Sequence, residues 1–249
     1  MADPDPATYG DRMAEIYDEY HEHLGAPEVV DPMVDVLAEL AGDGAALELG
    51  IGTGRIALPL AERGVEVHGI DVSEAMVAKL REKPGGPAIP VTMGDFTQFE
   101  LEGRYSVIYV VFNTLFSLPS QEAQVDCFRS VARHLAGGGV FVLEAFVPDP
   151  GRFDRGQRIS AGIVEDDRVT IDMGRHDPVT QTVTSSHLYI TPEEIRMYPV
   201  NTRYAWPSEL DLMAQLAGLR LRFRWADWRR APFTAASPGH VSVYERRSG

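Results

Sequence analysis

The chain has 249 residues, 44% of them hydrophobic, and a formal net charge of -14. This length and composition suit one α/β domain with a modest insertion better than two complete domains. The acidic balance would repel a nucleic-acid backbone, and no run of Lys and Arg forms a basic patch, which argues against nucleic acid as a partner. No signal-peptide pattern and no run of ~20 apolar residues is present, so we expect a cytoplasmic protein without a membrane partner.

The first 40 residues are predicted to form a tail and helices. Residues 1–8 are too polar and proline-rich to order themselves, and a helix is expected around residues 11–20. Asp31 and Pro32 have the cap-then-proline form of a helix start. These residues precede the part of the chain in which strands begin.

From residue 45 onward the pattern alternates between strand and helix. Strands are predicted at 45–49, 65–70, 89–93, 106–111 and 139–145, and helices at 54–63, 73–83 and 120–135. Several strands are apolar on both faces, as a parallel sheet covered by helices requires. The one cysteine, Cys127, falls within an apolar helical pattern and is expected in the core. The fold class predicted is α/β, with a doubly wound, mostly parallel, Rossmann-like sheet.

The pattern changes after Pro148. Residues 151–205 contain strand-like runs near 162–173, 181–190 and 194–204, which indicate an antiparallel β insertion after the fifth strand. A helix at 208–217 and strands at 219–225 and 240–245 then complete a seven-stranded sheet. We therefore expect residues 41–150 and 206–249 to form one domain that the insertion interrupts.

The turn after the first strand reads Glu48-Leu49-Gly50-Ile51-Gly52-Thr53-Gly54. Dinucleotide sites place their third glycine three positions after the second, where this chain has Arg55. Glu48 should face the same pocket as the turn, and a carboxylate about 4–6 Å from a pyrophosphate would cost roughly 3–4 kcal/mol. Beside a cation it would gain a similar amount, so the expected ligand is positively charged near the turn.

Asp71 ends the second strand, 21 residues after Gly50. A carboxylate at this position holds the two hydroxyls of a ribose. An adenosine ribose joined to a cationic amino-acid tail satisfies both acidic residues. With these motifs the chain resembles the class I S-adenosylmethionine-dependent methyltransferases, whose first motif is acid-x-Gly-x-Gly-x-Gly.

The resemblance implies S-adenosylmethionine as cofactor and assigns residues to its parts. Glu48, Gly50 and Gly52 would contact the methionine end, Asp71 the ribose, and Val72 and Met76 the adenine. The remaining cofactor contacts that it implies are Gly94, Asp95 and Phe96 near the adenine amino group, Phe112 and Asn113 where cofactor and acceptor meet, Arg55 at the carboxylate, and Tyr17 and Tyr20 on an N-terminal helix that covers the site. Alternatives stay open for several of these residues: Met76 in the helix core, Asp95 as a turn cap, Arg55 facing solvent, and Tyr17 and Tyr20 in ordinary helix packing.

Methyl transfer depends mostly on aligning the acceptor atom with the methyl group, and an alcohol acceptor usually benefits from a positioned base. The predicted catalytic residues are Tyr17, Glu144 and His187. Substrate contacts are predicted for Glu144, Phe146, His176, His187 and Tyr204, with residues 151–205 covering the acceptor pocket. No metal site is expected, because no acidic cluster has suitable spacing.

The sequence therefore predicts methyl transfer to a nitrogen or oxygen of a small-molecule acceptor. The chain also resembles antibiotic-pathway methyltransferases, and this resemblance favours nitrogen as the methylated atom and a secondary metabolite as the acceptor. Two alternatives stay open. One is a nicotinamide-dependent oxidoreductase, and the other is a non-catalytic protein that binds S-adenosylmethionine. The edge of the antiparallel insertion could also support a homodimer.

Overall fold

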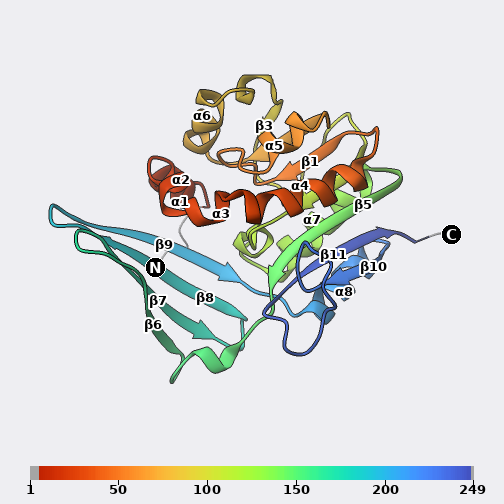
Figure 1. Cartoon of the computed structure of the whole chain (residues 1–249). Helices are drawn as coiled ribbons and strands as arrows, with labels where there is room; N and C mark the ends of the chain where they lie inside the picture. The colour runs from red at the N-terminus through yellow and green to blue at the C-terminus, as the bar shows by residue number, and fades with distance from the viewer. Residues whose placement is uncertain (1–5, 248–249) are drawn as a thin grey trace.

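The structure, a computed structural model, describes residues 6–247 and is built on a seven-stranded sheet (Figure 1). Its strands lie in the order β10-β11-β5-β4-β1-β2-β3. Strand β11 runs antiparallel to both of its neighbours, β5 and β10, and the other six strands all point in the same direction. The strands are β1 Ala46–Leu49, β2 Val67–Asp71, β3 Val91–Met93, β4 Tyr105–Val110, β5 Leu135–Phe146, β10 Leu219–Trp225 and β11 Gly239–Arg246. The predicted fold class is confirmed.

Helices cover both faces of this sheet. The apolar side chains of α4 (Pro27–Ala41) and α5 (Ala57–Glu62) belong to one core cluster, and those of α7 (Gln121–His134) and α8 (Pro207–Leu216) belong to the other. Cys127 of α7 is fully buried, as predicted. The remaining elements of the domain are α6 Glu74–Glu82 and the short 3-10 helices η1 Gly86–Ala88, η2 Thr114–Ser117 and η3 Pro150–Arg152.

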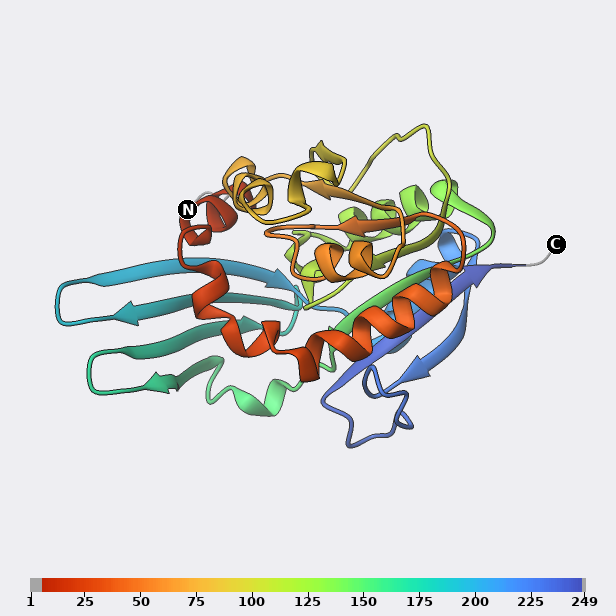
Figure 2. The ribbon, with the colours of Figure 1, turned by 45° about the horizontal axis from the view of Figure 1, so that its top comes forward.

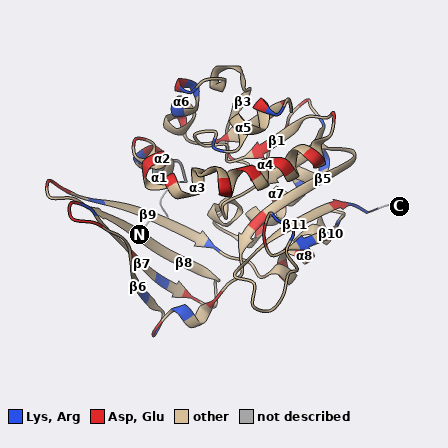
Figure 3. Ribbon diagram, viewed as in Figure 1, with Lys and Arg blue, Asp and Glu red and all other residues tan. Residues whose placement is uncertain are grey.

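A second sheet of four antiparallel strands follows β5 and extends away from the first (Figure 2). Its strands are β6 Gln157–Val164, β7 Val169–Asp177, β8 Thr182–Ile190 and β9 Ile195–Arg203. The sequence run expected at 162–173 is divided by a turn, in which the backbone N–H of Glu165 donates to the carbonyl of Arg168 at 2.8 Å. Asp and Glu residues occur at the two far hairpin turns of this sheet (Figure 3).

Three short helices, α1 Pro6–Met13, α2 Tyr17–Tyr20 and α3 Glu22–Gly25, lie between the two sheets. Of the expected N-terminal tail, residues 6–8 are helical and residues 1–5 lie outside the described part. The predicted helix start at Asp31 is wrong, because α4 begins with Pro27 at its first turn and contains Pro32. Proline suits the first helical turn, whose N–H groups have no partner within the helix, and Pro27 reaches that position first. Across residues 6–247, no helix combines the length and the apolar character that a membrane span needs.

Candidate active site

The carboxyl ends of β1, β2, β4 and β5 meet at one edge of the main sheet and carry the acidic residues that the sequence singled out. Glu48 on β1 is only 3% exposed, and its Oε2 accepts a hydrogen bond of 2.9 Å from the Tyr109 hydroxyl on neighbouring β4. Burial raises the pKa of Glu48 to about 8, against the lowering effect of the Tyr109 hydrogen bond. A cation next to Glu48 would restore its negative charge.

Asp71 at the end of β2 is buried and held by backbone donors. Its Oδ2 accepts from Gly52 N at 2.7 Å and its Oδ1 from Ser73 N at 2.8 Å. Burial raises its pKa, although the hydrogen bonds from Ser73 and Gly52 lower it. Each carboxylate oxygen has a second lone pair, so the same group can also accept from two ribose hydroxyls.

The third glycine of the turn has a packing reason. Gly54 has φ +80°, and a Cβ there would stand 2.3 Å from Cδ1 of Leu80 on α6. Because a side chain cannot fit and the left-handed backbone favours glycine, Gly54 brings α6 against the turn. This packing accounts for the third glycine of the G-x-G-x-G pattern.

Arg55 follows the turn and lies between two aromatic rings. Its Cζ is 5.1 Å from the ring centroid of Tyr17 and 4.8 Å from that of Phe112. Its Nη1 and Nη2 are buried and have no hydrogen-bond partner within the described residues. Buried donors are normally satisfied, and a guanidinium pairs best with a carboxylate or phosphate in bidentate geometry. The carboxylate of S-adenosylmethionine fits this unpaired group, whereas the alternative of a solvent-facing Arg55 does not.

Two hydrogen-bonded links hold the N-terminal helices over this edge. Asp18 on α2 accepts from the Thr53 hydroxyl at 2.6 Å and lies 2.6 Å from Lys83 Nζ. Asp11 on α1 accepts from the Ser73 hydroxyl at 2.6 Å. These links place α2, with Tyr17, directly above Arg55.

The residues expected around the adenine lie on the α6 side of the turn. Val72 remains 38% exposed, whereas Met76 is 5% exposed and packs in a cluster with Met13 and Tyr198. Asp95 follows Gly94, the residue after β3, and its Oδ1 accepts from the backbone and hydroxyl of Thr97, as in the turn-cap alternative. Phe96 is buried in the core, with its ring edge near Gly50. The adenine contacts of these residues stay predictions.

Beyond β4, Phe112 and Asn113 adopt left-handed backbone conformations, with φ 53° and 65°. Their backbone is held by β5, because Glu144 Oε2 accepts from Phe112 N at 2.8 Å and Asn113 Oδ1 accepts from Phe146 N at 2.7 Å. Glu144 Oε1 also accepts from the Trp228 indole at 3.0 Å. Strained, well-supported backbone of this kind is common at functional sites.

Both oxygens of Glu144 therefore have protein donors. Burial raises its pKa, and the bonds from Phe112 and Trp228 oppose that shift. This arrangement suits Glu144 to supporting Phe112. Its predicted contact with the acceptor stays a prediction.

The predicted residues of the insertion fall into two separate places. His187 on β8 lies 2.5 Å from Asp172 on β7 and places its ring 6.2 Å from the ring of Tyr20. His176 Nε2 lies 2.8 Å from the Tyr204 hydroxyl. Asp172 pairs with His187 in the sheet register, and His176 lies four residues further along β7, so the two histidines are roughly 13 Å apart along the strands.

Sequence reasoning missed several residues that complete the site. They are Asp18, Tyr109, Asp172 and Trp228, whose contacts are described above. Each reaches its partner across the fold, between 15 and 84 positions away in the chain, so no local spacing could reveal the pair. For Asp172, the register of β7 against β8 was the only available signal, and it depends on the hairpin turns.

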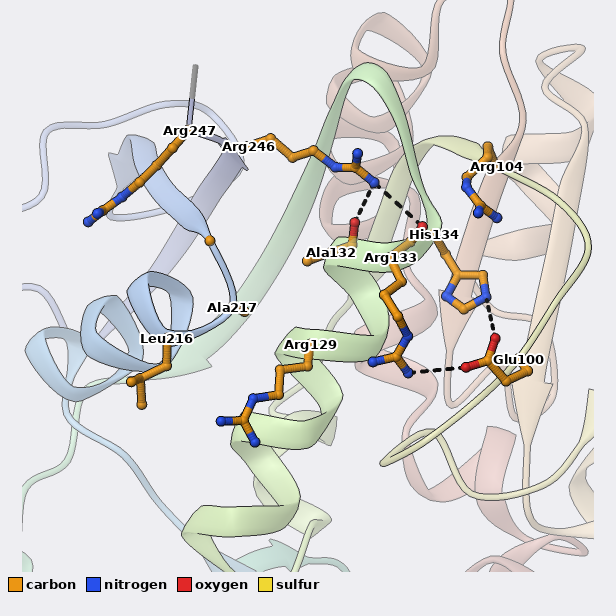
Figure 4. A pocket seen from close by; sticks show the side chains of 11 residues that line it. Glu100, Arg104, Arg129, Ala132, Arg133, His134, Leu216, Ala217, Arg246 and Arg247 are labelled. Atoms are coloured by element: carbon orange, nitrogen blue, oxygen red, sulfur yellow. Dashed lines mark hydrogen bonds and ion pairs between the residues drawn. The ribbon is translucent and has the colours of Figure 1, made fainter. Parts of the chain in front are cut away.

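A separate groove of about 690 Å³ lies at the other end of the main sheet, where α7 leads into β5 and α8 into β10 (Figure 4). Arginines dominate its lining, but Arg246 donates to the carbonyls of Ala132 and Leu135, and Arg133 pairs with Glu100. None of the residues that line this groove is among those described around Arg55. No group of three His, Cys, Asp or Glu residues suited to a metal ion occurs within residues 6–247.

Known proteins with similar sequences and structures identify the family to which this chain belongs. A family model described as a methyltransferase domain matches residues 46–139. The structure of the CcbJ methyltransferase from Streptomyces caelestis superposes with a TM-score of 0.92, at 42% sequence identity, over 98% of this chain and 100% of that chain. The chain belongs to the S-adenosylmethionine-dependent methyltransferases.

Two further relatives extend the comparison. The cypemycin N-terminal methyltransferase of a Streptomyces species is 28% identical over 252 residues, which is 98% of this chain and 99% of the relative. CalS10, an amino pentose methyltransferase of Micromonospora echinaspora solved with S-adenosylmethionine bound, has the same fold at a TM-score of 0.71 and 21% identity, covering 93% of this chain and 97% of that chain. The predicted enzyme class and cofactor are confirmed, and the alternative of a nicotinamide-dependent oxidoreductase is wrong.

Proposed function

We propose that this methyltransferase transfers a methyl group to an amine nitrogen of a small natural-product acceptor. The observation that carries the proposal is the guanidinium of Arg55, whose buried Nη1 and Nη2 have no partner among residues 6–247, at the same sheet edge as the buried Glu48 and Asp71. This set of groups matches a zwitterionic amino acid joined to a ribose. The choice of nitrogen over oxygen is supported by the relative named as the cypemycin N-terminal methyltransferase, which matches this chain over almost its whole length.

When bound, S-adenosylmethionine supplies a methyl carbon on positively charged sulfur. Glu48 would lie near the ammonium, Arg55 would pair with the carboxylate, and Asp71 would accept from the ribose hydroxyls. Tyr17 would cover this end of the site, and burial raises the pKa of its hydroxyl, which therefore stays protonated and able to donate. These residues fix the position of the methyl carbon, which is the larger part of catalysis for an amine acceptor.

The acceptor would lie between the Phe112–Asn113 turn and the inner face of the four-stranded sheet. Phe146 borders this region from β5, and its ring meets that of Phe116 at 5.0 Å. His176 and Tyr204 would contact the part of the acceptor furthest from the methyl group, and His187 the part below Tyr20. Glu144 would act on this region mainly by holding Phe112 in place.

The experiment compares acceptors that differ by one heteroatom. Glucosamine with glucose, and alanyl-alanine with lactyl-alanine, are incubated with the enzyme and S-adenosylmethionine, and S-adenosylhomocysteine release is measured. We expect turnover only with the amino member of a pair. Turnover with the hydroxyl member alone would overturn the choice of nitrogen, and S-adenosylhomocysteine binding that is unchanged in Asp71→Ala would overturn the assigned cofactor site.

The proposal also covers location and partners. Because the protein has a net charge of -14, a small molecule is a better acceptor than a nucleic acid. The cytoplasmic location expected from the sequence stays part of the proposal. Mobility-shift titration with RNA and DNA and cell fractionation test these two points.

We further propose a homodimer formed through the outer face of the four-stranded sheet. Tyr189 and Tyr198 pack on the N-terminal helices, so side chains at alternating positions face the other way. In the strand register these positions form three rows across the sheet: Val164, Val169, Ile190, Ile195; Ala161, Ile171, Leu188, Met197; and Ile159, Met173, Ser186, Pro199. No row contains a charge, and Ile159 and Ile195 are 75% and 69% exposed.

An apolar face of this kind marks an association surface. Because all three rows are uncharged, the face is complementary to itself, which is the condition for a two-fold symmetric pair. A second copy of the chain is therefore the occupant that we propose.

A further inference from the structure

Asp172 and His187 form a carboxylate–imidazole pair on the inner face of the four-stranded sheet. They stand opposite each other on β7 and β8, and Tyr198 stands opposite His187 on β9. His187 Nδ1 lies 2.5 Å from Asp172 Oδ1. The side chain of His187 is 26% exposed and that of Asp172 41%, so the imidazole is the more enclosed of the two.

The contact determines the tautomer of the imidazole. The hydrogen bond from His187 lowers the pKa of Asp172, which is therefore ionised near neutral pH and can only accept. Nδ1 must carry the proton that it donates to Asp172. In neutral His187 the lone pair is then on Nε2, the nitrogen that acts as a base.

A continuous series of aromatic contacts joins this pair to the cofactor site. The ring of His187 lies 6.2 Å from Tyr20, Tyr20 lies 4.9 Å from His21, and His21 lies 4.7 Å from Tyr17. Tyr17 in turn covers the guanidinium of Arg55. His187 thus lies on the sheet side of the helices that cover the glycine turn.

We propose that His187 is the proton acceptor of the methyl transfer and that Asp172 is the positioning residue that fixes its tautomer. The inference rests on the proposed amine acceptor. An alkylamine arrives as its ammonium form, which has no lone pair for attack. Nε2 of His187 takes one proton from it and leaves a neutral amine. The freed nitrogen pair then forms the N–C bond as the C–S bond breaks with its electrons on sulfur, so the sulfur becomes neutral and the methylated amine carries the positive charge.

The titratable groups that face this pair come from the N-terminal helices and from the neighbouring strands. Burial, and next the charge of Arg55, lower the pKa of His21 to about 4, so His21 is neutral at pH 7. Burial raises the pKa of Tyr20 to about 12 and that of Tyr9 still further. The charge of Arg158 on β6 also lowers the pKa of Asp172. Tyr198 on β9 is the remaining titratable residue opposite His187.

The test combines a spectroscopic and a kinetic readout on the full chain. Nitrogen-15 NMR of the histidine side chains, assigned with His187→Gln, should give His187 as the Nδ1–H tautomer in the wild type and a mixture in Asp172→Asn. With alanyl-alanine or glucosamine, whichever turns over, kcat/KM at pH 7 should fall about 100-fold in His187→Gln and about 10-fold in Asp172→Asn, with KM for S-adenosylmethionine unchanged.

The pH profile separates positioning from folding. Without the carboxylate the imidazolium is less stable, so the acidic limb of kcat/KM should move to lower pH in Asp172→Asn. In His187→Gln, kcat/KM should instead rise with pH up to the pKa of the acceptor amine itself. His68→Gln is the matched control. His68 on β2 places its Nε2 3.0 Å from Glu66, the residue before that strand, away from the site, so its loss should leave rate and profile unchanged.

An Nε2–H tautomer in the wild type, or an acidic limb that stays in place in both variants, would overturn the inference. If only the hydroxyl acceptors turn over, the proposed amine function fails, while the tautomer measurement still decides the pair by itself. The two failures are therefore distinguishable.

Discussion

Arg55, Glu48 and Asp71 show why charge, rather than the glycine count, identifies the ligand of this site. Two buried carboxylates near one another would destabilise a site that held a phosphate, and a buried guanidinium without a partner would destabilise one that held nothing. A ligand with an ammonium, a carboxylate and a ribose satisfies all three. The sequence provided the types of these residues, and the fold brought them to one edge of the sheet.

Replacing Arg55 by alanine should weaken S-adenosylhomocysteine binding about 10- to 100-fold, because a charged hydrogen-bonded pair contributes roughly 1.5–3 kcal/mol. Arg55→Lys should restore little of it, since an ammonium cannot bind a carboxylate in bidentate geometry. Calorimetry measures both. 5′-Methylthioadenosine, which has no carboxylate, should bind equally to wild type and variant, and an equal loss for both ligands would contradict the assignment. Arg129→Ala, at the distant groove, is the control.

Glu48 should make cofactor binding depend on pH. Its raised pKa of about 8 leaves it protonated at pH 7, and the ligand ammonium favours the carboxylate. S-adenosylhomocysteine binding at pH 7 should therefore release close to one proton, and affinity should rise from pH 6 to pH 8. Calorimetry in buffers of different ionisation enthalpy measures the release. Glu48→Gln should abolish it, Asp126→Asn on α7 should not, and release that persists in Glu48→Gln would assign the proton elsewhere.

At the scale of elements, the site depends on how the short helices α1 and α2 attach to the glycine turn. Two aspartates provide the attachment, through Ser73 and through Thr53 and Lys83. Neither aspartate stands out in the sequence, because each acts on a residue more than 30 positions away. The sequence predicted one helix around residues 11–20, whereas the chain forms two short helices there, Pro6–Met13 and Tyr17–Tyr20.

Asp18→Asn should loosen α2 without removing any group that contacts the cofactor. The variant loses the ion pair with Lys83 and weakens the bond from Thr53, so the dissociation rate of S-adenosylhomocysteine should rise about 5- to 10-fold. Surface plasmon resonance on immobilised enzyme measures it. Asp35→Asn, which removes a surface ion pair between α4 and Arg63, is the matched control. An unchanged dissociation rate in Asp18→Asn would mean that α2 does not limit release.

At the scale of the whole molecule, the four-stranded sheet has two faces with different tasks. Its inner face carries the Asp172–His187 pair and packs on the N-terminal helices, and the three rows of its outer face described above are uncharged and mostly apolar. Polar and apolar residues alternate along its strands, as in a sheet with two different environments. We therefore expect the outer face to be covered in solution.

Met197→Lys should convert the dimer to a monomer, because it buries a charge at the centre of an apolar contact. Light scattering with size-exclusion chromatography measures the mass. Val179→Lys, in the turn after β7 and 90% exposed, should leave the mass unchanged. A wild type that runs as a monomer at micromolar concentration would contradict the proposed interface.

The sequence by itself determined the fold class, the cofactor and the enzyme class. It could do so because strand and helix periodicity, the glycine turn and the two strand-end carboxylates are local patterns whose physical requirements the chain displays directly. The tertiary structure decided that Arg55 lacks a partner, that Glu144 supports Phe112, and that Asp172 meets His187. Those facts depend on sheet register and on contacts between distant segments, which local patterns do not specify, because register is set by turns and by packing over the whole domain.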